Sequence, residues 1–257
     1  MKIGKLSAIE KDFIWSLATN SKHNLINNFN MLEDKNKIFS YCNLNNIELF
    51  LYNFLEKNVS DMNNKDTYLA LKSQVDGKKI KTLMNISAGI KLCKEFSRNN
   101  INYVALKGLS YIDKINVDER LFRDLDILVD IKDIEKSVQI AQKNGFIFKN
   151  NKRFTRDLIT KRLDKYCLPQ MYDSNNVVLE IHYRIEANEL IQCKLAAKML
   201  AEKKLTTAYG QQFYAPTNEY KFIHLAYHAI SKGNFDVGIS SIFDLFIFKN
   251  KGMIDPI

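Results

Sequence analysis

The residues best suited to chemistry are acids inside short apolar stretches, the clearest being DLDILV at residues 124–129. The alternation predicts a strand in which Leu125, Ile127 and Val129 share one face and Asp124 and Asp126 the other, about 7 Å apart. Two carboxylates this close repel each other and are costly to remove from water. The pair indicates either a charged strand face that discourages aggregation or a divalent metal site, and this stretch alone leaves both open.

A further acid, Glu180, lies in the alternating stretch VVLEIHYRI. The period of two places it on one face with Val178 and His182. If this strand lies beside DLDILV, three carboxylates converge, which is what two Mg²⁺ ions need for displacement at phosphorus. The turn KGLS, which contains Gly108, could add backbone N–H groups for phosphate oxygens.

The elements that must position these acids begin with helices over residues 5–97, where apolar residues recur at three- and four-residue spacing. In the last of these helices we expect Leu83, Ile86, Ile90 and Phe96 at core positions.

A small mixed sheet is predicted next. INYVALKG and DLDILVDI are expected as strands, KDIEKSVQIAQKNG as a helix that ends at Gly145, and FIFK as a short strand. CLPQMYD and VVLEIHYRI flank SNN as a hairpin. From Glu186 onward the pattern predicts helices again, which gives an α+β order.

Composition narrows the class of protein. The chain has 257 residues, 46% hydrophobic and 26% charged, and no apolar run long enough to span a membrane, so we expect a cytoplasmic protein. The scattered cysteines form no CxxC pair, which argues against a zinc site or a disulfide framework. The net charge of +9 is spread along the chain. It indicates a compositional bias more than a nucleic-acid stripe, although attraction to an anionic partner stays open.

The ordered motifs resemble those of the bacterial uncharacterised nucleotidyltransferase family, within the superfamily typified by DNA polymerase beta. The resemblance covers roughly residues 80–250. The matching residues are Leu106-Lys107-Gly108, Arg120, Asp124-x-Asp126 with Leu128-Val129, Glu180-x-His182 with Arg184, His224, His228 and Asp244.

The resemblance implies a small mixed β-sheet nucleotidyltransferase core flanked by N-terminal and C-terminal helical parts. We expect a helical region at 1–98, the core at 99–186 and a second helical region at 187–257. Two departures stand out. The turn in the superfamily is usually Gly-Ser or Gly-Gly, whereas here it reads Gly108-Leu109-Ser110. A phosphate contact is therefore expected from Gly108 more than from Ser110. The chain also ends at KNKGMIDPI, where the family usually continues, so a partner could complete it.

The family pattern also implies roles for residues. Those expected to be catalytic and to bind two Mg²⁺ ions (Mn²⁺ being possible) are Asp124, Asp126 and Glu180. Those expected to bind the nucleotide are Lys107, Gly108, Ser110, Arg120 and Arg123. Those expected to contact substrate or support the site are His182, Arg184, His224, His228 and Asp244. For each a bland alternative stays open: a solvated charge, a strand-ending glycine or a packing residue.

The implied reaction moves a nucleoside monophosphate from a nucleoside triphosphate, ATP for instance, to an acceptor. A small molecule, a protein or peptide, and RNA are all open as acceptors, and the absence of an aromatic ladder favours the first two. The alternatives are a catalytically weakened module that binds a nucleotide or a partner, and a helical interaction protein built around a small sheet.

Overall fold

The structure is a computed structural model, and it describes all residues except 1–4, 59–64, 150–166, 186–188, 232–238 and 254–257. The chain forms two compact units, one of residues 1–79 with 225–257 and one of residues 80–224. Helices α5 and α9 contribute to both. These units group elements by packing, whereas the division at residues 98 and 186 follows element types along the sequence and remains a prediction.

The first unit is helical. Its elements are α1 (Ala8–Thr19), α2 (Lys22–Asn30), α3 (Lys35–Leu44), α4 (Glu48–Asn58), the first part of α5 (Lys65–Arg98), the end of α9 (Asn218–Ser231) and α10 (Ile239–Asn250). Ser7 and Glu10 form a capping box that starts α1. The rings of Phe13, Phe29 and Phe54 pack with centroids 5.5 to 5.7 Å apart and form the aromatic centre of this unit.

The second unit contains the sheet. Its elements are the rest of α5, β1 (Tyr103–Ala105), η1 (Lys107–Tyr111), β2 (Asp124–Val129), η2 (Ile131–Asp133), α6 (Ile134–Lys143), β3 (Ile147–Phe148), β4 (Met171–Tyr172), β5 (Val178–His182), α8 (Glu189–Ala201), β6 (Lys204–Ala208), β7 (Gln211–Ala215) and the start of α9. The five-stranded sheet has the order β1-β2-β5-β4-β3, and β6 pairs with β7 alone. Among the strand pairs that the structure describes in this sheet, β2 with β5 is the parallel one. The chain between these two strands includes α6, which provides the long crossover that a parallel pair needs.

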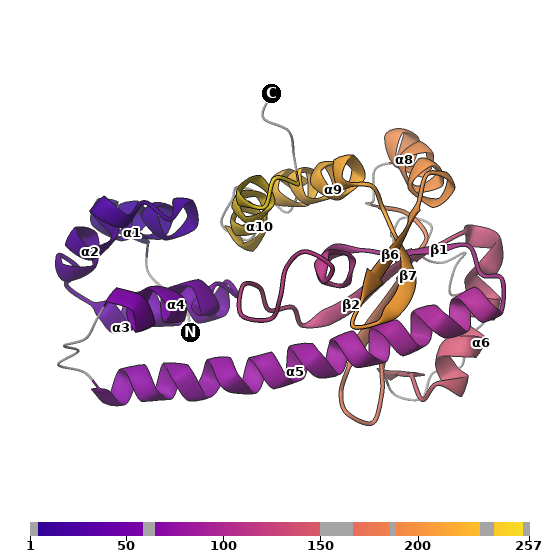
Figure 1. The fold of residues 1–257 in the computed structure, drawn as a ribbon, viewed down its shortest axis with the longest axis horizontal. Helices are drawn as coiled ribbons and strands as arrows, with labels where there is room; N and C mark the ends of the chain where they lie inside the picture. The colour runs from indigo at the N-terminus through magenta and orange to yellow at the C-terminus, as the bar shows by residue number, and fades with distance from the viewer. Residues whose placement is uncertain (1–4, 59–64, 150–166, 186–188, 232–238, 254–257) are drawn as a thin grey trace. The chain divides into compact units, whose positions relative to one another are not determined.

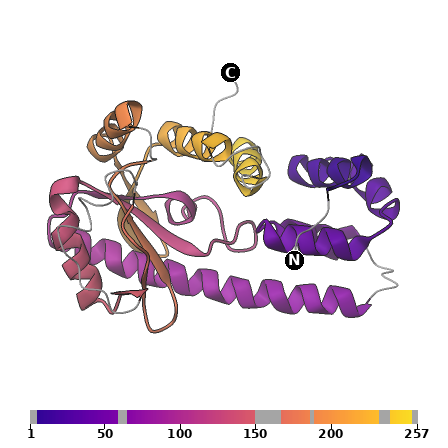
Figure 2. The same ribbon diagram turned by 180° about the vertical axis from the view of Figure 1, so that it is seen from behind.

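The sheet lies between helices on both faces (Figure 1 and Figure 2). On one face Leu125, Ile127 and Val129 of β2 pack with residues of α5 and α6, as the alternation predicted. On the other face Leu128 packs with Met199 of α8. Strand β2 is therefore a central, buried strand, which removes the edge-strand explanation of its two aspartates.

The α+β fold predicted from the sequence is confirmed, including the buried first strand, the helix before Gly145, and the hairpin that pairs Met171 with Leu179. One prediction was wrong in part, because the region after Glu186 contains the β6–β7 hairpin as well as helices. The alternation in TTAYGQQFYA, at residues 206–215, is the sequence signal for this hairpin. The turn has positive φ at Tyr209 and Gly210, which suits a two-residue hairpin.

A second correction concerns α5. Ile86, Ile90 and Phe96 are buried as expected, but Leu83 is 44% exposed. The buried positions on this turn belong instead to polar residues, Thr82 and Asn85.

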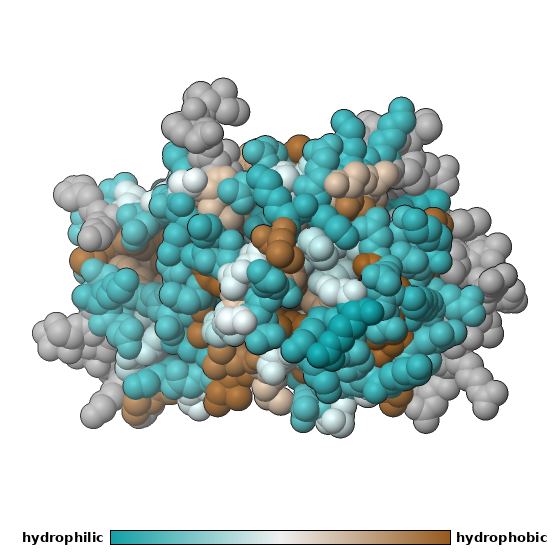
Figure 3. Space-filling model, turned by 45° about the vertical axis from the view of Figure 1, so that its right-hand side comes forward, coloured by the Kyte–Doolittle hydropathy of each residue, from teal (hydrophilic) through white to brown (hydrophobic). Residues whose placement is uncertain are grey.

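On the face drawn in Figure 3, hydrophilic residues dominate and hydrophobic ones form small separate patches. Among the described residues, no helix has the length and apolar character needed to cross a membrane.

Candidate active site

The parallel pairing of β2 with β5 brings two of the three candidate acids together. Asp126 lies opposite Glu180 in this pairing, and Leu128 lies opposite His182. The side chains of Asp126, Glu180 and His182 therefore lie on the same face of neighbouring strands. The condition set in the sequence analysis, that VVLEIHYRI lies beside DLDILV, is therefore met.

Asp126 is 1% exposed, and two side chains compensate its burial. Lys107 Nζ lies 2.6 Å from Asp126 Oδ1, and His182 Nε2 lies 2.8 Å from the same oxygen. Because a carboxylate only accepts hydrogen bonds, both nitrogens donate to it. A buried carboxylate held by two donors is far more stable than an isolated one.

These contacts shift the pKa values of the whole group. Burial alone would raise the pKa of the Asp126 carboxyl, but the Lys107 cation and the His182 hydrogen bond hold it well below its usual range. Burial would lower the pKa of Lys107, but the charges of Asp126 and Asp124 raise it. Burial would also lower the pKa of His182, whereas its hydrogen bonds to Asp126 and Glu180 raise it. The charged forms of Asp126 and Lys107 thus stabilise each other against burial.

Asp124 differs from Asp126. It is half-buried at the start of β2. The nearby Asp126 charge and burial raise the pKa of its carboxyl to about 6. A pKa raised by a like charge marks a place where an added cation would be favourable.

Glu180 is held on its surface side by Gln170, which lies just before β4, and by Tyr172 of β4. Gln170 Nε2 donates to Glu180 Oε1 at 2.7 Å, and the Tyr172 hydroxyl donates to Gln170 Oε1 at 2.6 Å. Glu180 Oε2 lies 3.5 Å from His182 Nε2. The hydrogen bond with His182, opposed by burial, lowers the pKa of the Glu180 carboxyl. Both carboxylate oxygens therefore have assigned partners.

The group Asp126, Glu180 and His182 has the chemistry of a cation site. One possible ligand atom from each lies within 4.8 Å of the others, and Asp124 is not among the three. Carboxylate oxygens are the ligands that Mg²⁺ and Mn²⁺ prefer, so the two acids fit such an ion. His182 fits better as the hydrogen-bond partner that orients Asp126.

The turn after β1 is tight and specific. Lys107 has a positive φ of 42°, which is uncommon for a long side chain and which directs it back toward β2. Leu106 N donates to Asp126 O at 2.8 Å, which joins the turn to the strand. The Ser110 hydroxyl is buried and donates to Lys107 O at 2.8 Å, so it closes the turn from inside.

The arginines lie around this turn with different exposure. Arg120 is half-buried, and its Nη1 donates to the neighbouring Leu121 O. Arg123 is exposed just before β2. Arg184, after β5, lies with its Cζ 5.9 Å from the ring centroid of Tyr183.

The remaining candidates divide between the two units. His224 is buried in the unit that holds the sheet, whereas His228 and Asp244 belong to the other. In that unit, His228 Nδ1 lies 3.2 Å from Ser241 Oγ, and Asp244 is buried in α10. Their proposed roles toward a substrate stay predictions.

Two residues of this site were missed from the sequence. Gln170 and Tyr172 precede the hairpin turn, and their spacing of two is the only sequence signal that they share a face. The contact between Lys107 and Asp126 was also not foreseen, because it depends on the left-handed backbone at Lys107.

Comparisons with known proteins agree with the motifs. A family model described as an uncharacterised nucleotidyltransferase matches residues 32–255, a range that includes every candidate site residue. A crystal structure of the lincosamide antibiotic adenylyltransferase LnuA with lincomycin is similar at 15% identity and a TM-score of 0.35, over 57% of this chain and 90% of that one. A likeness at this TM-score says nothing about what the present chain binds. No curated protein matched the sequence.

Proposed function

The chain belongs to the family of uncharacterised nucleotidyltransferases, and from this premise we propose that it transfers a nucleoside monophosphate from a nucleoside triphosphate to an acceptor. The observation that carries the proposal is the meeting of Asp126 and Glu180 on adjacent parallel strands, with Lys107 beside them. This arrangement supplies metal-binding oxygens and a phosphate-binding cation at one place.

The residues divide into metal ligands and phosphate ligands. Asp126 and Glu180, with Asp124 once it is ionised, would hold Mg²⁺, which when bound polarises phosphate oxygens and offsets their charge. Lys107 lies beside Asp126 in this structure. When a triphosphate binds, the ammonium group of Lys107 can turn from the carboxylate to a phosphate oxygen. Arg120 and Arg123 lie close in sequence to the start of β2 and can add further positive charge.

In the proposed reaction, an acceptor oxygen or nitrogen attacks the α-phosphorus. The bond from that phosphorus to the bridging oxygen breaks, and pyrophosphate leaves. The acceptor's proton passes to a base, for which Glu180 is the candidate because it lies at the surface side of the group. The chain contributes mainly positioning and charge stabilisation.

The chemical class of the acceptor belongs to the proposal as well. We favour a small molecule or a protein or peptide over RNA, because the positive charge is spread along the chain without a basic stripe.

One observation favours a second candidate function, a module that binds a nucleotide or a partner without turnover. Lys107 and His182 already neutralise Asp126 within the protein. A buried carboxylate that already has two donors has less need of a metal ion.

One experiment separates these functions. Purified protein with Mg²⁺ is given each α-labelled nucleoside triphosphate and a cell extract as the acceptor pool. The comparison is with Asp126→Asn and with Asp76→Asn, a matched change at an exposed position of α5. Label that moves to a new species with wild type and Asp76→Asn, and not with Asp126→Asn, supports transfer. Triphosphate binding without label transfer supports the binding module. The absence of both label transfer and triphosphate binding would refute both functions.

A further inference from the structure

Helix α5 buries two polar residues, Thr82 and Asn85, that take no part in the proposed reaction. Thr82 is 1% exposed and Asn85 is 0% exposed, and they lie three residues apart on the same face of the helix. Threonine and asparagine are poor helix formers, and burying their polar groups is costly unless these are hydrogen-bonded. Their partners should therefore show what they are for.

Both residues bind the backbone of Phe122. The Asn85 Nδ2 atom donates to Phe122 O at 3.1 Å, and the Thr82 hydroxyl donates to the same oxygen at 3.3 Å. The Phe122 N–H points at Thr82 Oγ1, 3.4 Å away. Phe122 lies in an irregular segment just before β2, so α5 provides its backbone with partners that a strand neighbour would otherwise give.

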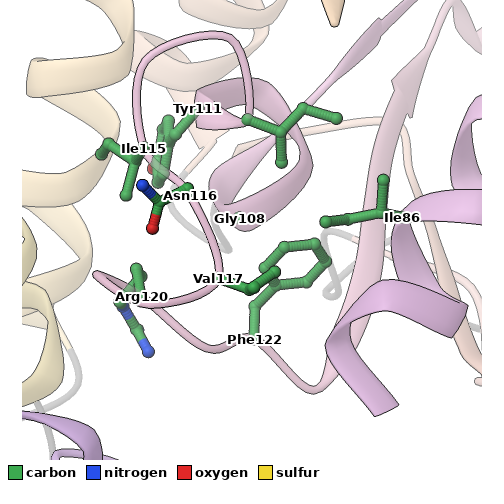
Figure 4. A pocket seen from close by; sticks show the side chains of 9 residues that line it. Ile86, Gly108, Tyr111, Ile115, Asn116, Val117, Arg120 and Phe122 are labelled. Atoms are coloured by element: carbon green, nitrogen blue, oxygen red, sulfur yellow. The ribbon is translucent and has the colours of Figure 1, made fainter. Parts of the chain in front are cut away.

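The side chain of Phe122 extends this connection to the turn after β1. A Cβ atom built on Gly108 would lie 2.3 Å from Cγ of the Phe122 ring, so the ring occupies the space beside this glycine. Figure 4 shows the ring with Ile86 and Gly108 around a cavity of about 10 Å³, room for about one water molecule. The ring thus fills the space beside the turn.

We propose that Thr82 and Asn85 are positioning residues for the candidate site. Their hydrogen bonds fix Phe122, whose backbone sets where β2 begins at Asp124 and whose ring supports the turn at Gly108. The same turn directs Lys107 to Asp126, so two side chains of α5 set the spacing between the carboxylates and the phosphate-binding turn. The inference rests on the proposed function only where nucleotide binding is measured.

The test uses Thr82→Val and Asn85→Leu in the full chain, since both changes keep the number and branching of the side-chain heavy atoms and remove hydrogen bonds. Thr82→Ser keeps the hydroxyl and serves as the conservative variant. Ser137→Ala is the matched control, because the buried Ser137 hydroxyl donates to Asp133 O at 2.8 Å in α6, away from Phe122. Urea unfolding, amide hydrogen exchange and the affinity for ATP with Mg²⁺ are measured for each variant.

We expect the Phe122 amide to exchange at least about fivefold faster in Thr82→Val, beyond any change in the slowest-exchanging amides, as suits the loss of a net hydrogen bond. ATP affinity should fall by a similar factor in Thr82→Val and Asn85→Leu. Thr82→Ser should retain both properties, and Ser137→Ala should lower stability alone.

Two results would overturn the proposal. One is faster exchange at all amides to the same degree, which would make the pair ordinary core residues. The other is unchanged ATP affinity despite a loosened Phe122. If wild type binds no nucleoside triphosphate, the proposed function fails separately. Hydrogen exchange at Phe122 and at the Gly108 turn then decides: joint local loosening supports the positioning role, and its absence refutes it.

Discussion

Replacing Gly108 by alanine tests the packing on which the candidate site depends. Gly108 does not adopt a positive φ, so alanine causes no backbone strain there. The cost comes only from the added Cβ atom, which would lie 2.3 Å from Cγ and 2.6 Å from Cδ1 of the Phe122 ring. An ordinary carbon–carbon contact is about 3.5 Å, so the ring or the turn has to move by about 1.2 Å.

The expected magnitude follows from which atoms lie nearest to the added carbon. These are Cγ and Cβ at the near end of the Phe122 side chain, and α5 holds the backbone of Phe122 through hydrogen bonds. Overpacking of this kind costs about 1–3 kcal/mol, against a gain of about 0.4–1 kcal/mol because alanine lowers the entropy of the unfolded chain. We expect a net loss of about 1–2 kcal/mol in the free energy of unfolding.

The matched control is Gly77→Ala, the same change at an exposed position inside α5. A Cβ atom there would meet nothing within 4 Å. Because glycine is about 0.8–1 kcal/mol less favourable than alanine inside a helix, Gly77→Ala should stabilise the protein by about that amount. Urea unfolding with an unchanged m-value measures both variants.

The two variants should shift the urea midpoint in opposite directions, and only Gly108→Ala should weaken binding of ATP with Mg²⁺. Equal stability of Gly108→Ala and wild type, with the Phe122 ring unmoved in a crystal structure of the variant, would refute the reasoning. The turn would then have more freedom than its contacts indicate.

Three further predictions concern charges. Because the like charge beside Asp124 and its burial raise the pKa of its carboxyl from 3.8 to about 6, Mg²⁺ affinity measured by calorimetry should fall as pH drops from 8 to 5. Without metal, the free energy of unfolding should fall as pH rises from about 4 to 6, because the raised pKa of Asp124 favours the protonated carboxyl in the folded state. A Mg²⁺ affinity that is flat over pH 5–8 would contradict the shift. Gln170→Leu removes the donor to Glu180 Oε1, so Mg²⁺ affinity should fall several-fold with stability changed by less than about 0.5 kcal/mol, since Gln170 is exposed. Lys78→Met leaves Glu48, which is 2% exposed, without its cation. The free energy of unfolding in urea should fall by about 2–3 kcal/mol, less than for a fully buried pair because Lys78 is 24% exposed. A loss under about 1 kcal/mol would show that water reaches Glu48.

Much of the fold could be predicted because its signals are local. The period-two alternation in DLDILV and VVLEIHYRI places the apolar residues of β2 and β5 in the core and their acids on the opposite face. The parallel pairing that sets Asp126 opposite Glu180 was expected only as a condition, because strand order depends on contacts far apart in the sequence.

The missed features depend on side chains that bind the backbone of another segment. No hydrophobic period predicts that Thr82 and Asn85, and not Leu83, face the interior, because their burial depends on the carbonyl group of Phe122. The contact of Lys107 with Asp126 likewise follows from a left-handed residue at the end of β1.

The pairing of Asp126 with Glu180 has a consequence for how this family can diverge. The pair is aligned by backbone hydrogen bonds between β2 and β5, and not by the length of the chain that connects them. Insertions in a surface connection cost little, whereas one extra residue within β5 before Glu180 would turn its carboxylate to the opposite face of the sheet. Across relatives, we expect length variation between these strands and none within them.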